Sequence, residues 1–249
     1  MNCQWKKILT GFVFLFFCTI TTAQKKAARF EIGAALSSFI YQGDLSPNKI
    51  GSYQTIRWGI NLHGSILLNK YFLIRTNLVM GGLKGDDAKY SNPKFRKQRA
   101  FNFTTPVIEL SQLLVWNPLG KNLVEQGFSV YVTVGAGVSF LKIKRDWSKF
   151  NVAYFENGSG LLEQIVRDSA HSLPNIIPVI PLGIGIRYAV SSSIVLNAES
   201  SYRLVFTDYL DGFSQAANAD RGDRYQTIII GIIYRPGNKN MLGCPVVKF

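Results

Sequence analysis

The sequence VYVTVGAGVSF at residues 130–140 alternates strictly between two kinds of side chain. Valine, alanine and phenylalanine occupy its even positions, whereas tyrosine, threonine, glycine and serine occupy the odd ones. Successive side chains of a β-strand point to opposite faces, so the segment predicts a strand with one apolar and one polar face. It is also long enough for a tilted strand to cross a lipid bilayer, which needs about 9–11 residues.

Seven further segments with similar alternation surround this one, and polar or glycine-rich stretches separate them. They cover residues 30–37, 58–66, 71–83, 107–116, 180–188, 196–203 and 227–235. The total of eight is an even number, as is usual for single-chain bacterial outer-membrane barrels. A soluble lipocalin-like barrel needs a polar outside, which residues 130–140 do not offer. The sequence therefore predicts an all-β protein, an eight-stranded antiparallel transmembrane β-barrel of the outer membrane.

The connections between these segments alternate in length. They are tight at Asn69-Lys70 and Ser191-Ser192 and moderate at residues 117–126, but long around residues 44–53, 84–100, 144–172 and 208–223. Outer-membrane barrels have short periplasmic turns and longer extracellular loops. The pattern thus predicts a multi-pass barrel with both termini in the periplasm.

The chain begins with the layout of a secretory signal peptide. Lys6 and Lys7 precede an apolar stretch, and Ala23 ends a small-residue site, so we expect cleavage of residues 1–23. Cys18 raises the alternative of a lipoprotein, but bulky Phe16 and Phe17 stand where lipoprotein processing needs small residues. The expected mature protein is a barrel over residues 24–236 with a periplasmic tail at 237–249.

The formal charge of +13 falls to +11 when Lys6 and Lys7 leave with the leader. A basic exported protein without a nucleic-acid motif suggests lipopolysaccharide phosphates, other anionic partners, or simply charged loops. We therefore expect contact with outer-membrane lipid and lipopolysaccharide and none with nucleic acid. One long loop is basic, and its charges either contact lipopolysaccharide phosphates or are simply solvated. They are Lys89, Lys94, Arg96, Lys97 and Arg99.

Charged side chains occupy several positions on the predicted inner face. By the alternation they are Glu31, Glu109, Glu199, Arg75, Arg187, Arg203 and Arg235, together with His63. The interior of an eight-stranded barrel is just wide enough for side chains to fill, and buried charges must pair to offset several kcal/mol of desolvation each. We expect an ion-pair network that closes the lumen; the alternatives are a proton or ion path and an internal catalytic group.

Little in the sequence indicates an enzyme or a cofactor. His63 and His171 are the only histidines, and neither stands in a Ser-His-acid arrangement or a zinc-ligand spacing. We therefore expect no catalytic residue, no cofactor and no metal ion. Acidic residues recur where the strands meet the long loops, where Asp more often shapes turns than binds calcium. These rim residues are Asp44, Asp86, Asp87, Asp208 and Asp211.

Four motifs occur in an order that resembles a known family. They are YQGDLSP at residues 41–47, GDD at 85–87, VIELS at 107–111 and FTDYLD at 206–211, and Cys244-Pro245 and Phe249 also look similar to the family's tail. The chain resembles the Bacteroidetes outer-membrane barrels that include PorG. The resemblance implies a component of the type IX secretion and gliding apparatus, linked to a periplasmic ring of PorK and PorN. The family also contains many members of unknown role.

The function expected from these observations is structural. The barrel would organise a secretion complex through its periplasmic turns and tail, where Cys244 is either an unpaired thiol or a contact to a partner. A small outer-membrane channel or transport protein is the first alternative. A lipid-modifying or proteolytic barrel enzyme is the second.

Overall fold

Eight long antiparallel strands form a closed barrel in the computed structural model, which describes residues 30–48, 50–123, 126–155, 160–217 and 222–236. The predicted signal peptide, the predicted tail and Cys244 lie outside the described residues. The barrel strands are β1 (Phe30–Gln42), β2 (Arg57–Leu67), β3 (Phe72–Asp86), β4 (Asn102–Trp116), β5 (Gly127–Leu141), β7 (Ile176–Ala189), β8 (Ile194–Val205) and β9 (Arg224–Tyr234). The prediction of an eight-stranded antiparallel barrel is confirmed.

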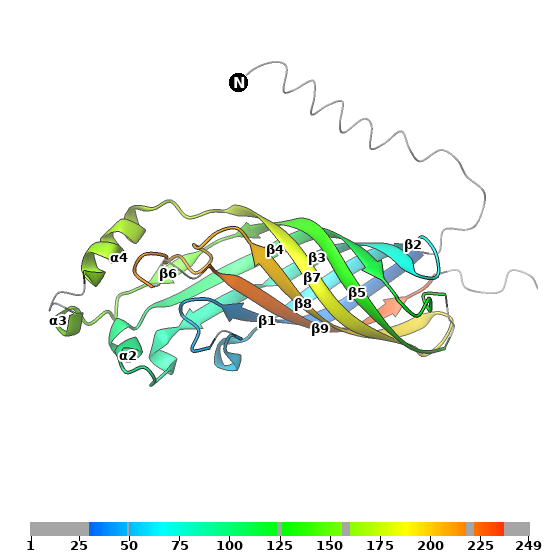
Figure 1. Ribbon diagram of the computed structural model, residues 1–249, viewed down its shortest axis with the longest axis horizontal. Helices are drawn as coiled ribbons and strands as arrows, with labels where there is room; N and C mark the ends of the chain where they lie inside the picture. The colour runs from blue at the N-terminus through cyan, green and yellow to red at the C-terminus, as the bar shows by residue number, and fades with distance from the viewer. Residues whose placement is uncertain (1–29, 49, 124–125, 156–159, 218–221, 237–249) are drawn as a thin grey trace, which may run out of the picture.

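Neighbouring strands follow one another along the chain, and the first strand closes the barrel against the last. β1 pairs with β9 over eleven positions, from Ile32 opposite Tyr234 to Gln42 opposite Arg224. The start of β1 and the end of β9 therefore lie at the end of the barrel that carries the short turns. Figure 1 shows the short helices gathered at the opposite end, beyond the long strands.

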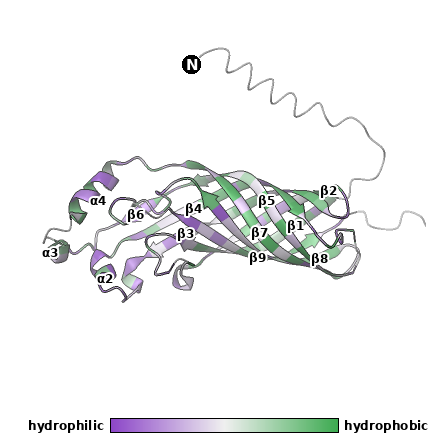
Figure 2. Ribbon diagram, viewed as in Figure 1, coloured by the Kyte–Doolittle hydropathy of each residue, from purple (hydrophilic) through white to green (hydrophobic). Residues whose placement is uncertain are grey.

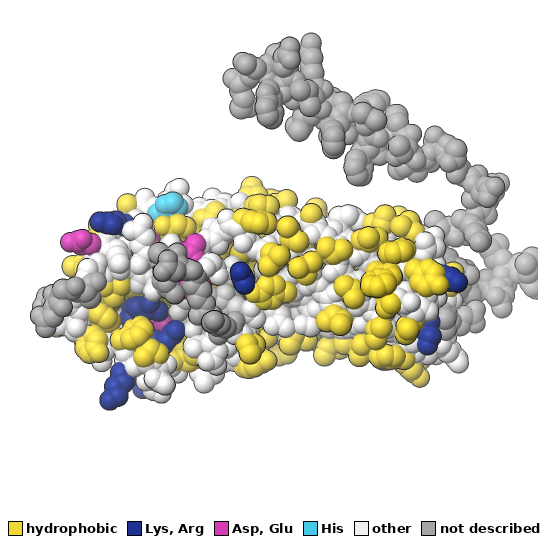
Figure 3. All heavy atoms as spheres, in the orientation of Figure 1, with side chains coloured by type: hydrophobic (Ala, Val, Ile, Leu, Met, Phe, Trp, Pro, Cys, Tyr) yellow, Lys and Arg dark blue, Asp and Glu magenta, His cyan; other side chains and the backbone are white. Residues whose placement is uncertain are grey.

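The outer surface of the barrel is apolar and its interior is mainly polar along the strands. In β5, Val134 is 45% and Phe140 47% exposed on the outer surface. The side chains of Tyr131 and Ser139, at alternate positions of the same strand, face the interior and are fully buried. Figure 2 shows hydrophobic residues over the barrel and hydrophilic ones concentrated at the loop end. Figure 3 shows mainly hydrophobic side chains over the barrel wall on one face, with most of the visible Lys and Arg toward the loop end or the short-turn end. A closed sheet with this distribution suits lipid outside and leaves no unpaired strand edge.

One close approach inside the barrel requires glycine. A Cβ atom added to Gly185 in β7 would lie 2.3 Å from Cζ of Tyr131, in the neighbouring strand β5. The missing side chain therefore makes room for the tyrosine ring, whose hydroxyl donates a hydrogen bond to Glu199 inside the barrel.

The strands reach further toward the loops than their alternation predicts. β3 continues to Asp86 and β4 begins at Asn102, and their added outward positions include Lys84 and Thr104. The hydrogen-bonded ladder thus extends beyond the apolar belt, and an apolar-outside pattern could not reveal that part. In β7 the additional residues include Pro178, which is atypical of a strand interior.

The long connections contain the remaining elements. These are η1 (Tyr53–Thr55), η2 (Asp87–Lys89), α2 (Phe95–Arg99), the short strand β6 (Lys144–Asp146), α3 (Val152–Phe155) and α4 (Leu161–Ala170). β6 pairs with the first residues of β4 and so continues the β4–β5 hairpin. None of the helices in the described ranges is long and apolar enough to cross a membrane.

Candidate functional site

Three layers of paired charges cross the lumen at increasing distance from the short-turn end. The lower layer is centred on Glu31 at the start of β1, which is 1% exposed. One of its carboxylate oxygens accepts a hydrogen bond from Arg187 at the end of β7, and the other accepts one from Nε of Arg235 at 2.8 Å. Arg235 also donates to the backbone oxygen of Asn122 at 3.2 Å, which ties this layer to the connection at residues 117–126.

The middle layer joins β3, β5 and β8. Oε2 of Glu199 lies 2.7 Å from Nη1 of Arg75 and accepts a hydrogen bond from the hydroxyl of Tyr131 at 2.9 Å. The guanidinium of Arg75 also lies over the Tyr131 ring, 5.2 Å from its centroid. The two charges are thus paired and partly enclosed by an aromatic face.

The upper layer surrounds Glu109, whose side chain is fully buried in β4. Arg203 donates from Nε to Oε2 at 3.1 Å and from Nη2 to Oε1 at 3.4 Å, a two-point contact. Tyr225 donates to Oε2 at 2.9 Å and Ser111 to Oε1 at 3.1 Å. Each oxygen of this carboxylate therefore accepts hydrogen bonds from two donors. The layer spans the barrel from β4 to β8 and β9.

The two histidines lie in different environments. His63 faces the lumen as predicted, but its Nδ1 lies 3.1 Å from Oδ1 of Asn61 rather than beside a carboxylate. His171 follows α4 in the loops and stacks on Tyr209 with ring centroids 4.0 Å apart. Each ring thus has a structural contact, and the two are not in one site.

Above the charged layers, the loop end of the lumen is filled by an apolar core. Phe39 and Phe103 from the strands pack there with Phe101, Leu210 and Phe213 from the loops. Phe101 and Phe213 stack with ring centroids 4.4 Å apart. We call the loop residues of this core, with the polar contacts that hold them, the loop cap. The barrel is therefore covered at this end by folded loops.

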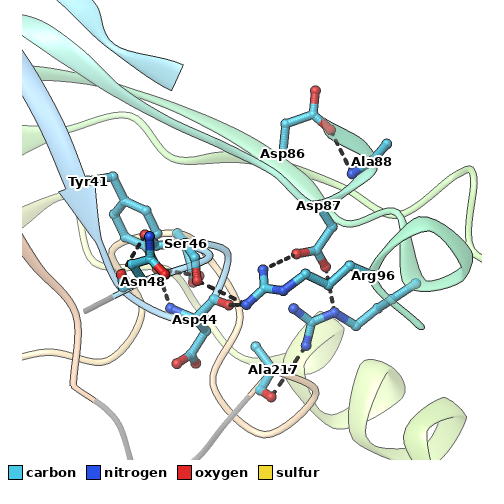
Figure 4. A network of polar contacts seen from close by, with 11 residues as sticks. Tyr41, Asp44, Ser46, Asn48, Asp86, Asp87, Ala88, Arg96 and Ala217 are labelled. Atoms are coloured by element: carbon cyan, nitrogen blue, oxygen red, sulfur yellow. Dashed lines mark hydrogen bonds and ion pairs between the residues drawn. The ribbon is translucent and has the colours of Figure 1, made fainter. Parts of the chain in front are cut away.

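Asp87 is the centre of one set of polar contacts in the loop cap (Figure 4). One of its oxygens lies 2.8 Å from Nη1 of Arg96, and the other 2.5 Å from Nε of Arg99. Arg96 donates further to the backbone oxygens of Asp44 and Ser46, at 3.3 and 2.9 Å. Arg99 donates to the backbone oxygen of Ala217 at 3.4 Å. One carboxylate thus connects the first, second and fourth long loops.

This arrangement corrects the interpretation of the basic loop. Arg96 is 8% and Arg99 5% exposed, so the expectation that they are solvated or face lipid phosphates is wrong. They stand three positions apart on α2, which places them on one side of the helix toward the same carboxylate. That spacing was the available signal in the sequence, but only the fold shows which acid they meet.

A second carboxylate, which the sequence did not single out, joins the third and fourth loops. Asp168 on α4 is 1% exposed and accepts hydrogen bonds from the backbone N–H groups of Ser214, Gln215 and Ala216 at 3.2, 3.2 and 2.9 Å. It therefore fixes α4 against the loop before β9.

A third cluster holds two buried carboxyl groups against one hydroxyl. The oxygen of Tyr41 lies 2.7 Å from Oδ2 of Asp211 and 2.5 Å from Oδ1 of Asp223, and it accepts from the N–H of Asp44 at 3.0 Å. A phenol has one hydrogen, so both short contacts are hydrogen bonds only if one carboxyl keeps a proton. Burial raises the pKa of Asp211 and of Asp223 well above the ordinary range, and their mutual repulsion raises that of Asp223 further.

The predicted rim acids thus have several separate roles. Asp86 caps η2 by accepting from the N–H of Ala88 at 3.1 Å, which is the expected turn chemistry. Asp208 accepts from the hydroxyl of Ser214 at 2.5 Å, while Asp44 and Asp211 belong to the Tyr41 cluster and Asp87 to the arginine contacts. Within the described ranges, no group of three or more His, Cys, Asp and Glu side chains is placed to hold a metal ion.

The closed strand pairing, the apolar outer surface and the charged interior define a small transmembrane β-barrel. The chain belongs to the family described as Domain of unknown function (DUF6089), which matches residues 7–234. No curated protein matches the sequence.

Several solved barrels are similar in architecture. Ail, the attachment invasion locus protein of Yersinia pestis, solved with the heparin analogue sucrose octasulfate, has a TM-score of 0.45 at 13% identity, covering 84% of this chain and 98% of Ail. OprG from Pseudomonas aeruginosa gives 0.46 at 10% identity, covering 84% and 96%. Neisserial surface protein A gives 0.43 at 13% identity, covering 83% and 96%. At these scores the likeness extends no further than the general architecture.

Proposed function

We propose that this protein is a non-enzymatic outer-membrane barrel that serves as a structural component of the type IX secretion system. The observation that carries the proposal is the closure of the lumen, which three charge layers cross and an apolar loop core covers. Side chains of the described residues thus stand across the lumen at several levels, and we expect them to prevent steady passage of a solute. The role of the barrel is then to hold other proteins rather than to conduct.

The proposed orientation places the short turns in the periplasm and the loop cap outside the cell. The apolar belt between them matches the hydrocarbon of a bilayer, and transmembrane barrels of bacteria carry their longer loops on the outer side. Both ends of the described chain then face the periplasm, because β1 starts and β9 ends beside the short turns.

The proposed partner is the periplasmic ring formed by PorK and PorN. The support is the resemblance of the four sequence motifs to the PorG-like barrels, together with an exposed surface on the longest of the short turns. That turn presents Leu119 at 52% and Leu123 at 38% exposure, with exposed Lys121 between them. Exposed apolar side chains beside a charge are suited to a protein contact.

An affinity pull-down from a type IX secretion strain tests this assignment. The full chain should recover ring proteins, and the double substitution Leu119→Asp with Lys121→Glu should reduce recovery by about tenfold or more. The matched control, Ile50→Asp with Lys89→Glu, changes an exposed apolar residue and an exposed lysine at the loop end and should leave recovery unchanged. Absence of ring proteins from the unaltered pull-down, with normal cargo export in a deletion strain, would contradict the role.

Planar-bilayer recording separates this proposal from the channel alternative. The full chain should give no steady current, because the Glu31, Glu199 and Glu109 layers block the lumen in series. A stable open conductance from the unaltered protein would favour transport instead.

The enzyme alternative is tested by His63→Ala and His171→Ala, which should both leave complementation of a deletion strain intact.

A further inference from the structure

Three lysines share one outward patch at the loop end of the barrel wall. Lys84 in β3 and Lys144 in β6 both stand directly opposite Thr104 of β4, one on each side of it. Lys142 lies two residues before Lys144, and its backbone N–H donates to the oxygen of Pro106 at 3.2 Å. Neighbouring strands lie about 4.8 Å apart, so the Cα atoms of Lys84 and Lys144 are about 10 Å apart. The Cα atom of Lys142 lies about 7 Å from that of Lys144, toward the short turns.

The inward positions beside these lysines establish which way the side chains point. Leu83 and Leu141 are buried in the apolar core at the loop end, and Ile143 packs against it. Side chains alternate along an extended chain, so Lys84, Lys142 and Lys144 face outward. Lys142 and Lys144 are exposed, and Lys84 is partly exposed.

This patch lies directly above the apolar belt. The next outward row toward the short turns contains Gly82, Pro106 and Lys142, and the row after it contains Met80, Ile108 and Phe140. Ile108 is 48% and Phe140 47% exposed on that outer surface. A lipid whose acyl chains lie against this row would have its headgroup at the level of the lysines.

Within the described part of the chain, none of the three lysines forms an ion pair with a carboxylate. The six ion pairs found there all use arginine. The nearest carboxylates on this face, Asp86 and Asp146, lie one row closer to the loops, where each accepts a backbone N–H, from Ala88 and Ser148. The lysine ammonium groups can therefore face an anion at the headgroup level.

We propose that Lys84, Lys142 and Lys144, with the hydroxyl of Thr104 between them, bind a phosphate group of a phosphorylated glycolipid of the outer leaflet. The inference rests on the outer-membrane location and orientation in the proposed function, and it adds a lipid ligand. Ammonium groups on long stems suit phosphate as point charges, and basic residues near an anionic membrane surface are attracted to its headgroups. The neighbouring apolar row fixes the headgroup at the level where these charges meet it.

Native mass spectrometry of the full chain in detergent micelles tests the site, with bisphosphorylated lipid A as the probe and phosphatidylcholine as competitor. The triple variant Lys84→Gln, Lys142→Gln, Lys144→Gln should bind lipid A at least about tenfold more weakly. The matched control Lys89→Gln, Lys94→Gln, Lys97→Gln loses the same charge from exposed loop positions and should bind normally. The corresponding triple arginine variant should also retain binding.

Two further arms identify the chemical source. Dephosphorylated lipid A should bind the unaltered chain no better than the triple glutamine variant binds lipid A. Inorganic phosphate should fail to displace bound lipid A. Equal binding of the dephosphorylated lipid, equal weakening by the control triple, or displacement by inorganic phosphate would each overturn the assignment. If the lipid selectivity is intact but the pull-down recovers no ring proteins, only the secretion role is contradicted. The pull-down tests the short-turn end of the barrel, whereas the lipid assay tests the loop end.

Discussion

The two halves of the lumen are closed by different interactions. The half near the short turns is crossed by charges, with Glu31 and Glu199 each paired to arginine in a buried setting. The half near the loops is filled by aromatic rings such as Phe101 and Phe213, and its polar groups tie one loop to the next. The barrel wall constrains the first half from all sides, whereas the second must assemble from connections far apart in the sequence. Charge pairing therefore depends on the strands, and the cap depends on packing between loops.

The largest effect should come from removing one charge of the upper layer. Glu109→Ala leaves Arg203 buried without its carboxylate, and breaking a buried pair in this way costs about 3–5 kcal/mol. Urea titration in micelles should show the loss as a lower unfolding midpoint of the whole barrel. The double replacement Glu109→Leu with Arg203→Met removes both charges and should recover most of the stability, since similar apolar replacements are often neutral or stabilising. A double variant as unstable as the single one would contradict this account.

A smaller and more local effect should follow from opening the aromatic core of the loop cap. Phe213→Ala removes a fully buried ring, a change that costs about 3–5 kcal/mol in protein cores, but here the loss falls on the cap. Limited proteolysis should cut the loops faster while the strands stay resistant and the unfolding midpoint of the barrel changes little. The control Phe206→Ala, at a ring 68% exposed, should behave like the unaltered chain. Barrel unfolding in parallel with loop cleavage would show that the two halves are not separable.

The smallest effect should be a dependence of the cap on pH. Burial raises the pKa of Asp211 and Asp223 in the folded cap, so the folded state holds a proton more tightly than the open state. Their stabilising contribution is complete below the ordinary Asp pKa and is lost as pH rises through the raised value. Hydrogen exchange around residues 206–217, corrected for the intrinsic exchange rate, should therefore quicken as the pH rises above the ordinary range of an Asp pKa.

Two variants sharpen that measurement. Asp223→Asn keeps a hydrogen-bond donor toward the Tyr41 oxygen without a titrating group, and it should flatten the pH dependence. Glu163→Gln removes an exposed carboxylate from α4 and should leave the dependence unchanged. The charges of Asp44 and Asp208 also raise the pKa of Asp211 and Asp223, so a weaker pH dependence of hydrogen exchange should remain in Asp223→Asn. An undiminished slope in Asp223→Asn would assign the effect to another group.

The sequence predicted the strands and their inner faces because a sheet has a fixed two-residue period. Alternation alone placed Glu31, Glu109, Glu199 and four arginines inside, and the structure pairs these residues across the lumen. It could not assign the pairs, because each joins strands that are far apart in the chain, such as Glu31 and Arg187. It also missed Tyr131 and Tyr225 as partners of the carboxylates, since their hydroxyls matter only once the barrel closes.

The loops contain the information that only the tertiary structure supplied. Loop residues have no period, so Arg96 and Arg99 resembled surface charge, and Asp168 and Asp223 gave no signal at all. Their contacts form when strand closure brings the long loops together at one end of the barrel. The sequence by itself therefore determined the barrel and the residues that face its interior. The tertiary structure alone decided which charges meet and how the loops cover the opening, because those interactions depend on distances that no local pattern encodes.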